Sequence, residues 1–149
     1  MSTKYATPLK FHKKVAQLQI DLAKPKEEEG KTKEGCLFIS LAKALDDNTG
    51  RMDWDNKINM KLGPMDISRI ITGVRSGQPV KLFHKSEAAG STTTLEVAAG
   101  ERKGTFKWFL NKTQGQDKKF GNIYLDQRDM FHIFIMFEAA LPIISGWTA

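Results

Sequence analysis

Cationic, aromatic and amide side chains alternate with apolar ones in the segment GTFKWFLNK, residues 104–112. Successive side chains of a β-strand point to opposite faces, so the segment divides into two sets. The first set is Phe106, Trp108 and Leu110, and the second is Lys107, Phe109 and Asn111. The first is typical of a core face, whereas the second has the chemistry that binds a single nucleic-acid strand, with charge for the phosphate and a flat ring for a base. The alternative is a solvated strand with one exposed apolar ring, which is common on protein surfaces.

The same mixture recurs on two further strand-like segments and in the segment QDKKF. These sets are basic, amide or aromatic, with acids only at Asp53 and Asp55. Stacking a base on such a ring is worth about 1–3 kcal/mol, and lysines add a salt-dependent attraction to phosphates. The predicted nucleic-acid-binding residues are Lys57, Asn59, Lys61, Lys81, Phe83, Lys107, Phe109, Lys112, Lys118, Lys119 and Phe120. We expect a single strand rather than a duplex. The predicted helices are apolar, and the sequence offers no basic helix that could bind in a groove of duplex DNA.

Composition and charge agree with an anionic partner. The chain has 149 residues, which suits one domain over residues 1–149, and its 23 Lys and Arg exceed its 17 Asp and Glu to give a net charge of +6. The first residues lack the apolar stretch of a secretory signal, and no stretch approaches the roughly 18 apolar residues of a membrane span. We therefore expect a cytoplasmic protein, inside a bacterium or a virus-infected host cell, with no membrane partner.

Catalytic and metal-binding chemistry is not indicated. The sequence contains neither a G-x-x-x-x-G-K-[ST] loop nor a strand-linked G-x-G-x-x-G motif. Cys36, the single cysteine, lies in an apolar strand-like segment, and His84 and His132 are expected to be packing residues. Asp53 and Asp55 share a face but supply too few oxygen ligands for a cation. We expect no enzyme activity, no catalytic residues, no metal and no cofactor.

Hydrophobic periodicity predicts an α+β fold with about seven strands. The strands are expected at residues 15–22, 35–45, 52–62, 79–85, 92–98, 104–112 and 120–126. The highly charged residues 24–34 are expected to form a loop or a long hairpin tip, and about residues 1–8 a flexible N-terminus.

Two segments change to the period of a helix. Ile67, Ile70, Ile71 and Val74 predict a short amphipathic helix that begins near Pro64. The second helix, in residues 126–147, is apolar nearly all round, which in a small domain indicates a contact with another copy as well as a core. The predicted interface of a homodimer or higher homo-oligomer is Met130, Phe131, Phe134, Phe137, Leu141 and Trp147.

A weak internal echo links the two helices. Residues 60–71 match residues 123–134 at an offset of 63, pairing Leu62 with Leu125 and Asp66 with Asp129. In both segments a strand ends at the leucine and a helix follows whose first turn carries an aspartate, where a carboxylate suits the helix dipole. The echo indicates either a structural duplication or two similar strand-to-helix joints.

The order of elements, together with KFGNIYLDQRDMFHIFIMFEAAL at residues 119–141, resembles the Whirly family and the related transcription coactivator called positive cofactor four. The matching positions are Gly121, Ile123, Leu125, Asp129 and the helix from Met130. The resemblance implies curved antiparallel sheets in the order strands, helix, strands, helix, which bind single-stranded DNA, and helices that form the core or the oligomer contact. The segment KEGCLFISLAKAL lacks the second lysine of the plant Whirly strand, so the higher assembly of those proteins is not implied.

Two functions remain as hypotheses. The first is largely sequence-independent binding of single-stranded DNA, with RNA as an alternative partner, in replication, recombination or transcription. The second is a structural or assembly protein that oligomerises through its apolar C-terminal helix and has no specific nucleic-acid role.

Overall fold

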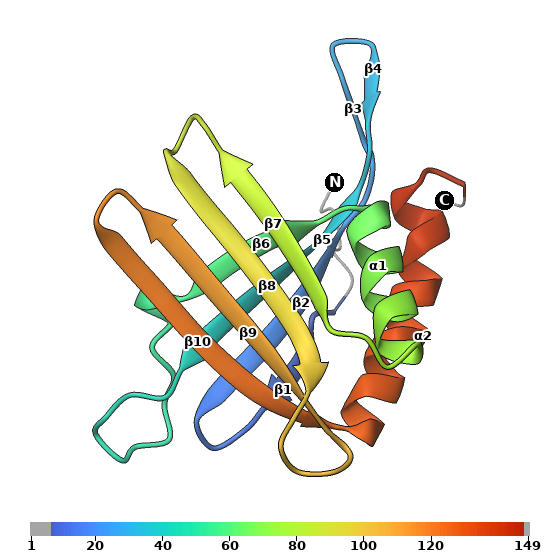
Figure 1. The fold of residues 1–149 in the computed structure, drawn as a ribbon. Coiled ribbons are helices and arrows are strands. Elements are labelled where there is room, and N and C mark those ends of the chain that lie inside the picture. The colour runs from blue at the N-terminus through green and yellow to red at the C-terminus, as the bar shows by residue number, and fades with distance from the viewer. Residues whose placement is uncertain (1–6, 148–149) are drawn as a thin grey trace.

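The computed structural model describes residues 7–147 as two four-stranded antiparallel sheets, a small hairpin and two α-helices (Figure 1). The N-terminal sheet has the order β1-β2-β5-β6 and the C-terminal sheet the order β10-β9-β8-β7. The N-terminal sheet is formed by β1 (Leu9–His12), β2 (Ala16–Ala23), β5 (Cys36–Lys43) and β6 (Ile58–Leu62). The C-terminal sheet is formed by β7 (Val80–Ser86), β8 (Ser91–Ala99), β9 (Thr105–Gln114) and β10 (Asp117–Asp126). The α+β class and the strands-helix-strands-helix order are confirmed.

The two sheets pack on each other through their inward faces. In Figure 1 the C-terminal sheet lies in front, the strands of the N-terminal sheet cross behind it, and both helices lie together at one side. One core cluster contains residues of both sheets and of both helices, α1 (Pro64–Arg75) and α2 (Gln127–Ile144). Trp108 is 1% exposed in this core, where its Nε1 lies 3.2 Å from the Sδ atom of Met130. The outward faces of the two sheets therefore point away from each other.

Three short strands were missing from the sequence prediction. β1 has only four residues, too few for a periodic pattern to stand out. The charged segment 24–34 contains β3 (Lys26–Glu28) and β4 (Lys31–Lys33), which pair only with each other and project from the sheets (Figure 1). The expected loop or hairpin tip is thus a hairpin, turned at Glu29 and Gly30 with φ of 52° and 76°. Of the N-terminus predicted to be flexible, about residues 1–8, residues 1–6 lie outside the described part of the chain.

Two boundaries were predicted wrongly. The strand expected at 52–62 begins only at Ile58, because Trp54–Asn56 forms a 3-10 helix, η1, in which Asn56 Nδ2 donates to Asp53 Oδ2 at 2.8 Å. Such local side-chain bonds compete with strand pairing. Strand β10 starts at Asp117 rather than at residue 120, because a two-residue turn at Gly115 and the residue after it lets the ladder continue.

The internal echo corresponds to a repeated architecture. Each half consists of four antiparallel strands followed by a helix, with the β3–β4 hairpin inserted in the first half. The last two strands of each sheet pair in matching register, Leu37 with Leu62 in one and Phe106 with Leu125 in the other. A single residue separates Leu62 from α1 and Leu125 from α2, so the offset of 63 marks equivalent positions in the two halves.

Polar side-chain contacts join the two halves reciprocally. They are the ion pair of Lys13 with Asp129 at 2.8 Å, the contact of His84 Nε2 with Asp66 Oδ2 at 2.9 Å, and the ion pair of Arg75 with Glu138. Asp66 and Asp129 also accept a backbone N–H at their helix N-termini, and each side chain therefore connects its own helix with the first hairpin of the other half. At α2 the backbone N–H of Asp129 donates to Asp126, which holds the pKa of the Asp126 carboxyl below its ordinary value. Within residues 7–147, neither helix is long and apolar enough to cross a membrane.

Candidate nucleic-acid interface

The outward side of the C-terminal sheet carries most of the predicted binding residues. The strand register places Phe83, Thr94, Asn111 and Phe120 in one row across the four strands, and Lys81, Glu96, Phe109 and Asn122 in the next. We call this surface the aromatic face. Its members that can contact a base or a phosphate are Lys81, Phe83, Lys85, Lys107, Phe109, Asn111, Lys118, Phe120, Asn122 and Tyr124.

Aromatic rings and ammonium groups follow one another along this face. The ring centroids of Phe109 and Phe120 are 6.4 Å apart at an interplanar angle of 35°. Lys107 Nζ lies 5.5 Å from the Phe109 centroid, and Lys43 Nζ lies 5.0 Å from the Phe120 centroid, so a cation flanks the ring pair at each end. Phe83 is 62% exposed and Phe120 is 55% exposed. The rings are thus open to a stacking base, and cations lie beside them for the phosphates.

The charge of the aromatic face is positive. It carries four lysines, against two carboxylates on the same side of the sheet: Glu96, whose Oε1 lies 3.6 Å from Lys81 Nζ, and Asp126 at the end of β10. Among the described residues, Lys85, Lys107 and Lys118 have no carboxylate within 4.0 Å. These three ammonium groups therefore have no intramolecular ion pair to break before they could meet a phosphate.

Lys112 and Lys119 do not belong to the aromatic face. The register pairs them with each other and aligns them with Thr93 and His84, on the inward side of the sheet beyond the end of the core. The reason is the two-residue period: Lys112 follows Trp108 and Leu110 on the same side of β9. The prediction took Lys118 and Lys119 together from the segment QDKKF, whereas in strand β10 they point to opposite sides.

Lys57, Asn59 and Lys61 lie on the N-terminal sheet, so the three predicted sets do not form one continuous surface. Asn59 and Lys61 face outward on β6, and Lys57 immediately precedes that strand. We call their surface the polar face, formed by Lys10, His12, Gln17, Gln19, Asp21, Phe38, Ser40, Ala42, Asn59 and Lys61. Its side chains bond to one another: Ser40 Oγ donates to Asn59 Oδ1 at 2.7 Å, and Gln19 Nε2 donates to Asp21 Oδ2 at 3.1 Å.

Sequence reasoning missed several residues beside the rings. Tyr124 and Asn122 share the side of Phe120 in β10, so the two-residue period of residues 120–126 could have identified them. Lys43 could not have been found this way, since it comes from β5 of the other sheet and meets Phe120 only in the tertiary structure.

The predicted oligomer interface is only partly exposed. Met130 is 3% exposed and Phe137 is not exposed, so both belong to the chain's own core, and their assignment to an interface is corrected. Phe131 is 67% exposed and Trp147 is 85% exposed, while Phe134 and Leu141 pack partly against the core. The exposed side chains of α2 also include two that were not in the predicted set, Ile135 and Met136. The exposed apolar side of the helix is therefore rotated by about a third of a turn from the centre of the predicted interface set.

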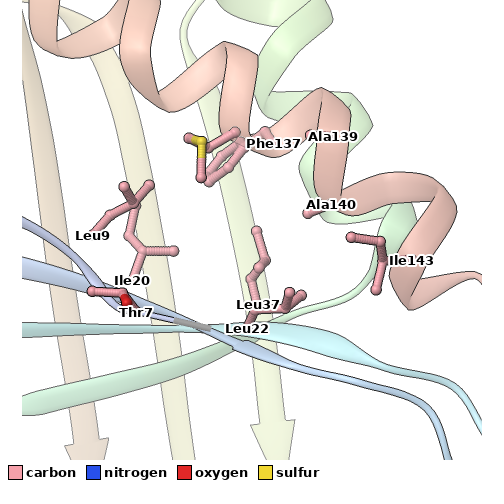
Figure 2. Close-up of a pocket in the computed structure, with 10 residues that line it drawn as sticks. Thr7, Leu9, Ile20, Leu22, Leu37, Phe137, Ala139, Ala140 and Ile143 are labelled. Atoms are coloured by element: carbon pink, nitrogen blue, oxygen red, sulfur yellow. The ribbon is translucent and has the colours of Figure 1, made fainter. Parts of the chain in front are cut away.

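An apolar pocket of about 90 Å³ lies between α2 and the N-terminal sheet (Figure 2). Leu9, Ile20, Leu22 and Leu37 line it from the strands, and Phe137, Ala140 and Ile143 from the helix. It contains no titratable group, so it offers packing surface rather than chemistry.

Metal and thiol chemistry find no support in residues 7–147. No three His, Cys, Asp or Glu side chains in that range are grouped as a metal site would need. Cys36 is buried, and burial raises the pKa of its thiol, which keeps it protonated and unreactive.

Comparison with known proteins identifies the relatives of the chain. Residues 11–118 match the sequence model of the Whirly transcription factor family. No curated protein sequence matches the chain significantly. Among solved structures, WHY3 from Arabidopsis thaliana is similar with a TM-score of 0.86 and 19% identity, over 98% of this chain and 92% of that one.

Two further plant structures share the fold. WHY1 from Arabidopsis thaliana has a TM-score of 0.84 and 18% identity, over 99% of this chain and 89% of that one. The plant transcriptional regulator PBF-2 has a TM-score of 0.80 and 18% identity, over 99% of this chain and 86% of that one. At these identities the structural likeness shows the fold alone.

Proposed function

Because this chain belongs to the Whirly transcription factor family, we propose that it binds single-stranded DNA and holds the strand on the aromatic face. The family is one of nucleic-acid-binding, non-enzymatic proteins, and a lack of catalytic activity in this chain stays a prediction. The observation that carries the proposal is that Phe83, Phe109 and Phe120 lie in two adjacent rows of one sheet surface, with lysines beside them. Stacking and phosphate attraction are insensitive to base identity, so binding is largely sequence-independent.

The biological setting proposed is DNA replication, recombination or transcription, in which single strands are exposed. RNA is the alternative partner, since ring stacking and phosphate contacts are common to both nucleic acids. The cytoplasmic location expected from the sequence stays a prediction.

The predicted contacts of Lys57, Asn59 and Lys61 form a separate proposal. A strand on the aromatic face reaches the polar face only by bending around the edge of the molecule, because the two faces point away from each other. On the polar face Asn59 is already bonded to Ser40, and glutamines replace the rings. We therefore assign the main affinity to the aromatic face and a smaller, charge-based contribution to these residues.

Self-association through α2 accompanies strand binding in this proposal. Members of the family form oligomers, and this chain exposes Phe131, Ile135, Met136 and Trp147 along and beyond α2. Exposed large apolar side chains gathered on one element indicate an interaction surface. The same surface supports the competing function, an assembly protein with no specific nucleic-acid role, which predicts oligomers without single-strand affinity.

Fluorescence anisotropy distinguishes the two functions. Labelled single-stranded DNA, single-stranded RNA and duplex DNA of one length are titrated with the protein at two salt concentrations. Tight binding of the single strand that weakens with salt, yet persists at physiological ionic strength, is the expected result. Equal and weak binding of all three that vanishes with added salt would reject strand binding and favour the assembly protein.

A further inference from the structure

A polar groove opens where the two sheets meet beside the aromatic face. We call it the end groove, and it is lined by Leu41, Lys43, Asp53, Asn56, Ile58, Lys118, Lys119 and Phe120. Its volume of about 280 Å³ is just below the roughly 300–1,000 Å³ of pockets that hold drug-sized ligands. The groove is therefore suited to one planar ring system rather than to a length of nucleic acid.

The groove has an apolar floor and an aromatic wall. Leu41 and Ile58 are almost fully buried beneath it, and the exposed ring of Phe120 borders it. A Cβ atom at Gly121 would lie 3.1 Å from Leu41 Cδ2, so the glycine allows β10 to approach β5 closely at this point. Because the Phe120 ring also contacts that of Phe109, a strand stacked on the aromatic face brings its next base to the groove.

The lining of the groove also includes a carboxylate held in place, that of Asp53. Asp53 Oδ2 accepts from Asn56 Nδ2 at 2.8 Å, and the Asp53 backbone N–H donates to the carbonyl of Lys43 at 2.8 Å. Among residues 7–147, no Lys, Arg or His nitrogen lies within 4.0 Å of the Asp53 carboxylate. The carboxylate therefore keeps acceptor capacity, and an ionised carboxylate can only accept hydrogen bonds.

We propose that the end groove holds one guanine base of the bound strand and that Asp53 accepts hydrogen bonds from it. Guanine presents two adjacent donors, N1–H and N2–H₂, on the edge that a carboxylate can meet with both oxygens. Its O6 and N7 atoms are acceptors, and lysine ammonium groups pair with them. Lys43, Lys118 and Lys119 line the same groove as Asp53, so donors and acceptors of the site match both edges of this base.

The other bases match the groove less well. Adenine and cytosine each offer one exocyclic amine beside a ring-nitrogen acceptor, and thymine places its one N–H between two carbonyl oxygens, which a carboxylate repels. A good two-bond pair discriminates between bases by roughly tenfold in affinity. The inference rests on strand binding by the aromatic face, to which it adds a modest preference at one nucleotide position.

The test uses a 15-nucleotide oligothymidine and three versions with one central dG, dA or dI, where the inosine base lacks the N2 amine. We expect the dG version to bind the full chain about tenfold more tightly than plain oligothymidine, with dI between the two. Asp53→Asn should remove this preference and leave the affinity for oligothymidine unchanged, because the amide oxygen still accepts from Asn56. Asp55→Asn, at an exposed neighbouring position outside the groove, should keep the preference.

The outcomes distinguish failure of the groove assignment from failure of strand binding. Equal affinity for all versions, or a guanine preference that survives in Asp53→Asn, would overturn the assignment of the end groove and leave strand binding intact. Failure of every oligonucleotide to bind the wild-type chain would overturn strand binding and the groove together. Circular dichroism of each variant confirms that the comparison is made between folded proteins.

Discussion

The two halves of the molecule share one architecture and differ in what they expose. Each is a four-stranded antiparallel sheet followed by a helix, with equivalent register at the last strand pair. The first half exposes a sheet face of lysines, polar side chains and one phenylalanine, Phe38, and a helix whose outward side is mostly polar. The second half exposes three aromatic residues on its sheet, beside the half-buried Phe109, and four large apolar ones along and beyond its helix.

The comparison indicates that one fold supplies two sheet surfaces whose side chains differ in what they offer to a ligand. On the polar face, side chains satisfy one another, as His12 Nδ1 and Gln17 Oε1 do at 2.9 Å. On the aromatic face the rings have an unoccupied side, so a base can stack on them without breaking an existing bond. Burying bonded polar groups costs free energy, whereas covering exposed rings releases it.

The largest expected difference between the halves is in self-association. Phe131→Glu places a charge in the proposed contact of α2, and an unpaired buried charge costs about 4 kcal/mol, so association should weaken about a thousandfold. Analytical ultracentrifugation over a concentration series measures the change. Met65→Glu is the matched control, because Met65 is 75% exposed on α1 and should tolerate the charge. Unchanged association of Phe131→Glu would show that α2 is not the contact.

A second difference concerns base stacking. The double variant Phe83→Ala with Phe109→Ala should weaken single-strand binding at least about 30-fold, since each stacked base is worth about 1–3 kcal/mol. Anisotropy titration with a labelled oligonucleotide measures it. Phe38→Ala, on the polar face, should change the affinity less than about threefold, because surface substitutions outside a contact usually change a free energy by about 0.5 kcal/mol or less. If the Phe38 variant loses as much affinity as the double variant, the two faces are equivalent and our assignment of the main affinity is wrong.

The smallest expected difference is in the response to salt. Replacing Lys107 and Lys118 with Gln should reduce the slope of log affinity against log salt by about 1.4, because each phosphate that a lysine neutralises on a single strand contributes about 0.7 to the slope. Lys10→Gln with Lys61→Gln removes the same charge from the polar face and should reduce the slope by less than half of that. Anisotropy titrations over a series of salt concentrations measure both slopes. If both double variants reduced the slope equally, Lys10 and Lys61 would contact phosphates as much as Lys107 and Lys118 do, and the polar face would belong to the main binding surface.

Alternation of side chains along single strands was readable in the sequence because it depends only on the two-residue period. It predicted correctly that Trp108 and Leu110 are buried while Phe109 lies on the other side of β9. Residues 67–74 likewise lie in a helix whose buried side is Ile67, Ile70 and Ile71. Boundaries were less readable, because the Asn56 to Asp53 hydrogen bond interrupts a segment that otherwise alternates.

The sequence did not predict which strands share one surface of a sheet. Lys61 and Lys107 both alternate with core residues, yet they lie on different sheets, since which strands pair depends on contacts between distant segments. The exposed side of α2 was misplaced for the same reason. Its helical pattern is apolar nearly all round, and only the position of the sheets determines that Met130 and Phe137 are covered while Phe131 is not.

The sequence by itself determined the class of the fold, the order of its elements and the family. It also determined the basic and aromatic character of the outward strand faces. These features depend on the local period of hydrophobic residues and on composition. The tertiary structure alone decided that these residues divide between two opposed faces, that Lys43 reaches the Phe120 ring, and that Asp53 lines the same groove as Phe120. Such contacts depend on how the two sheets pack across each other. Packing between segments that are far apart in the chain leaves no periodic signal in either segment.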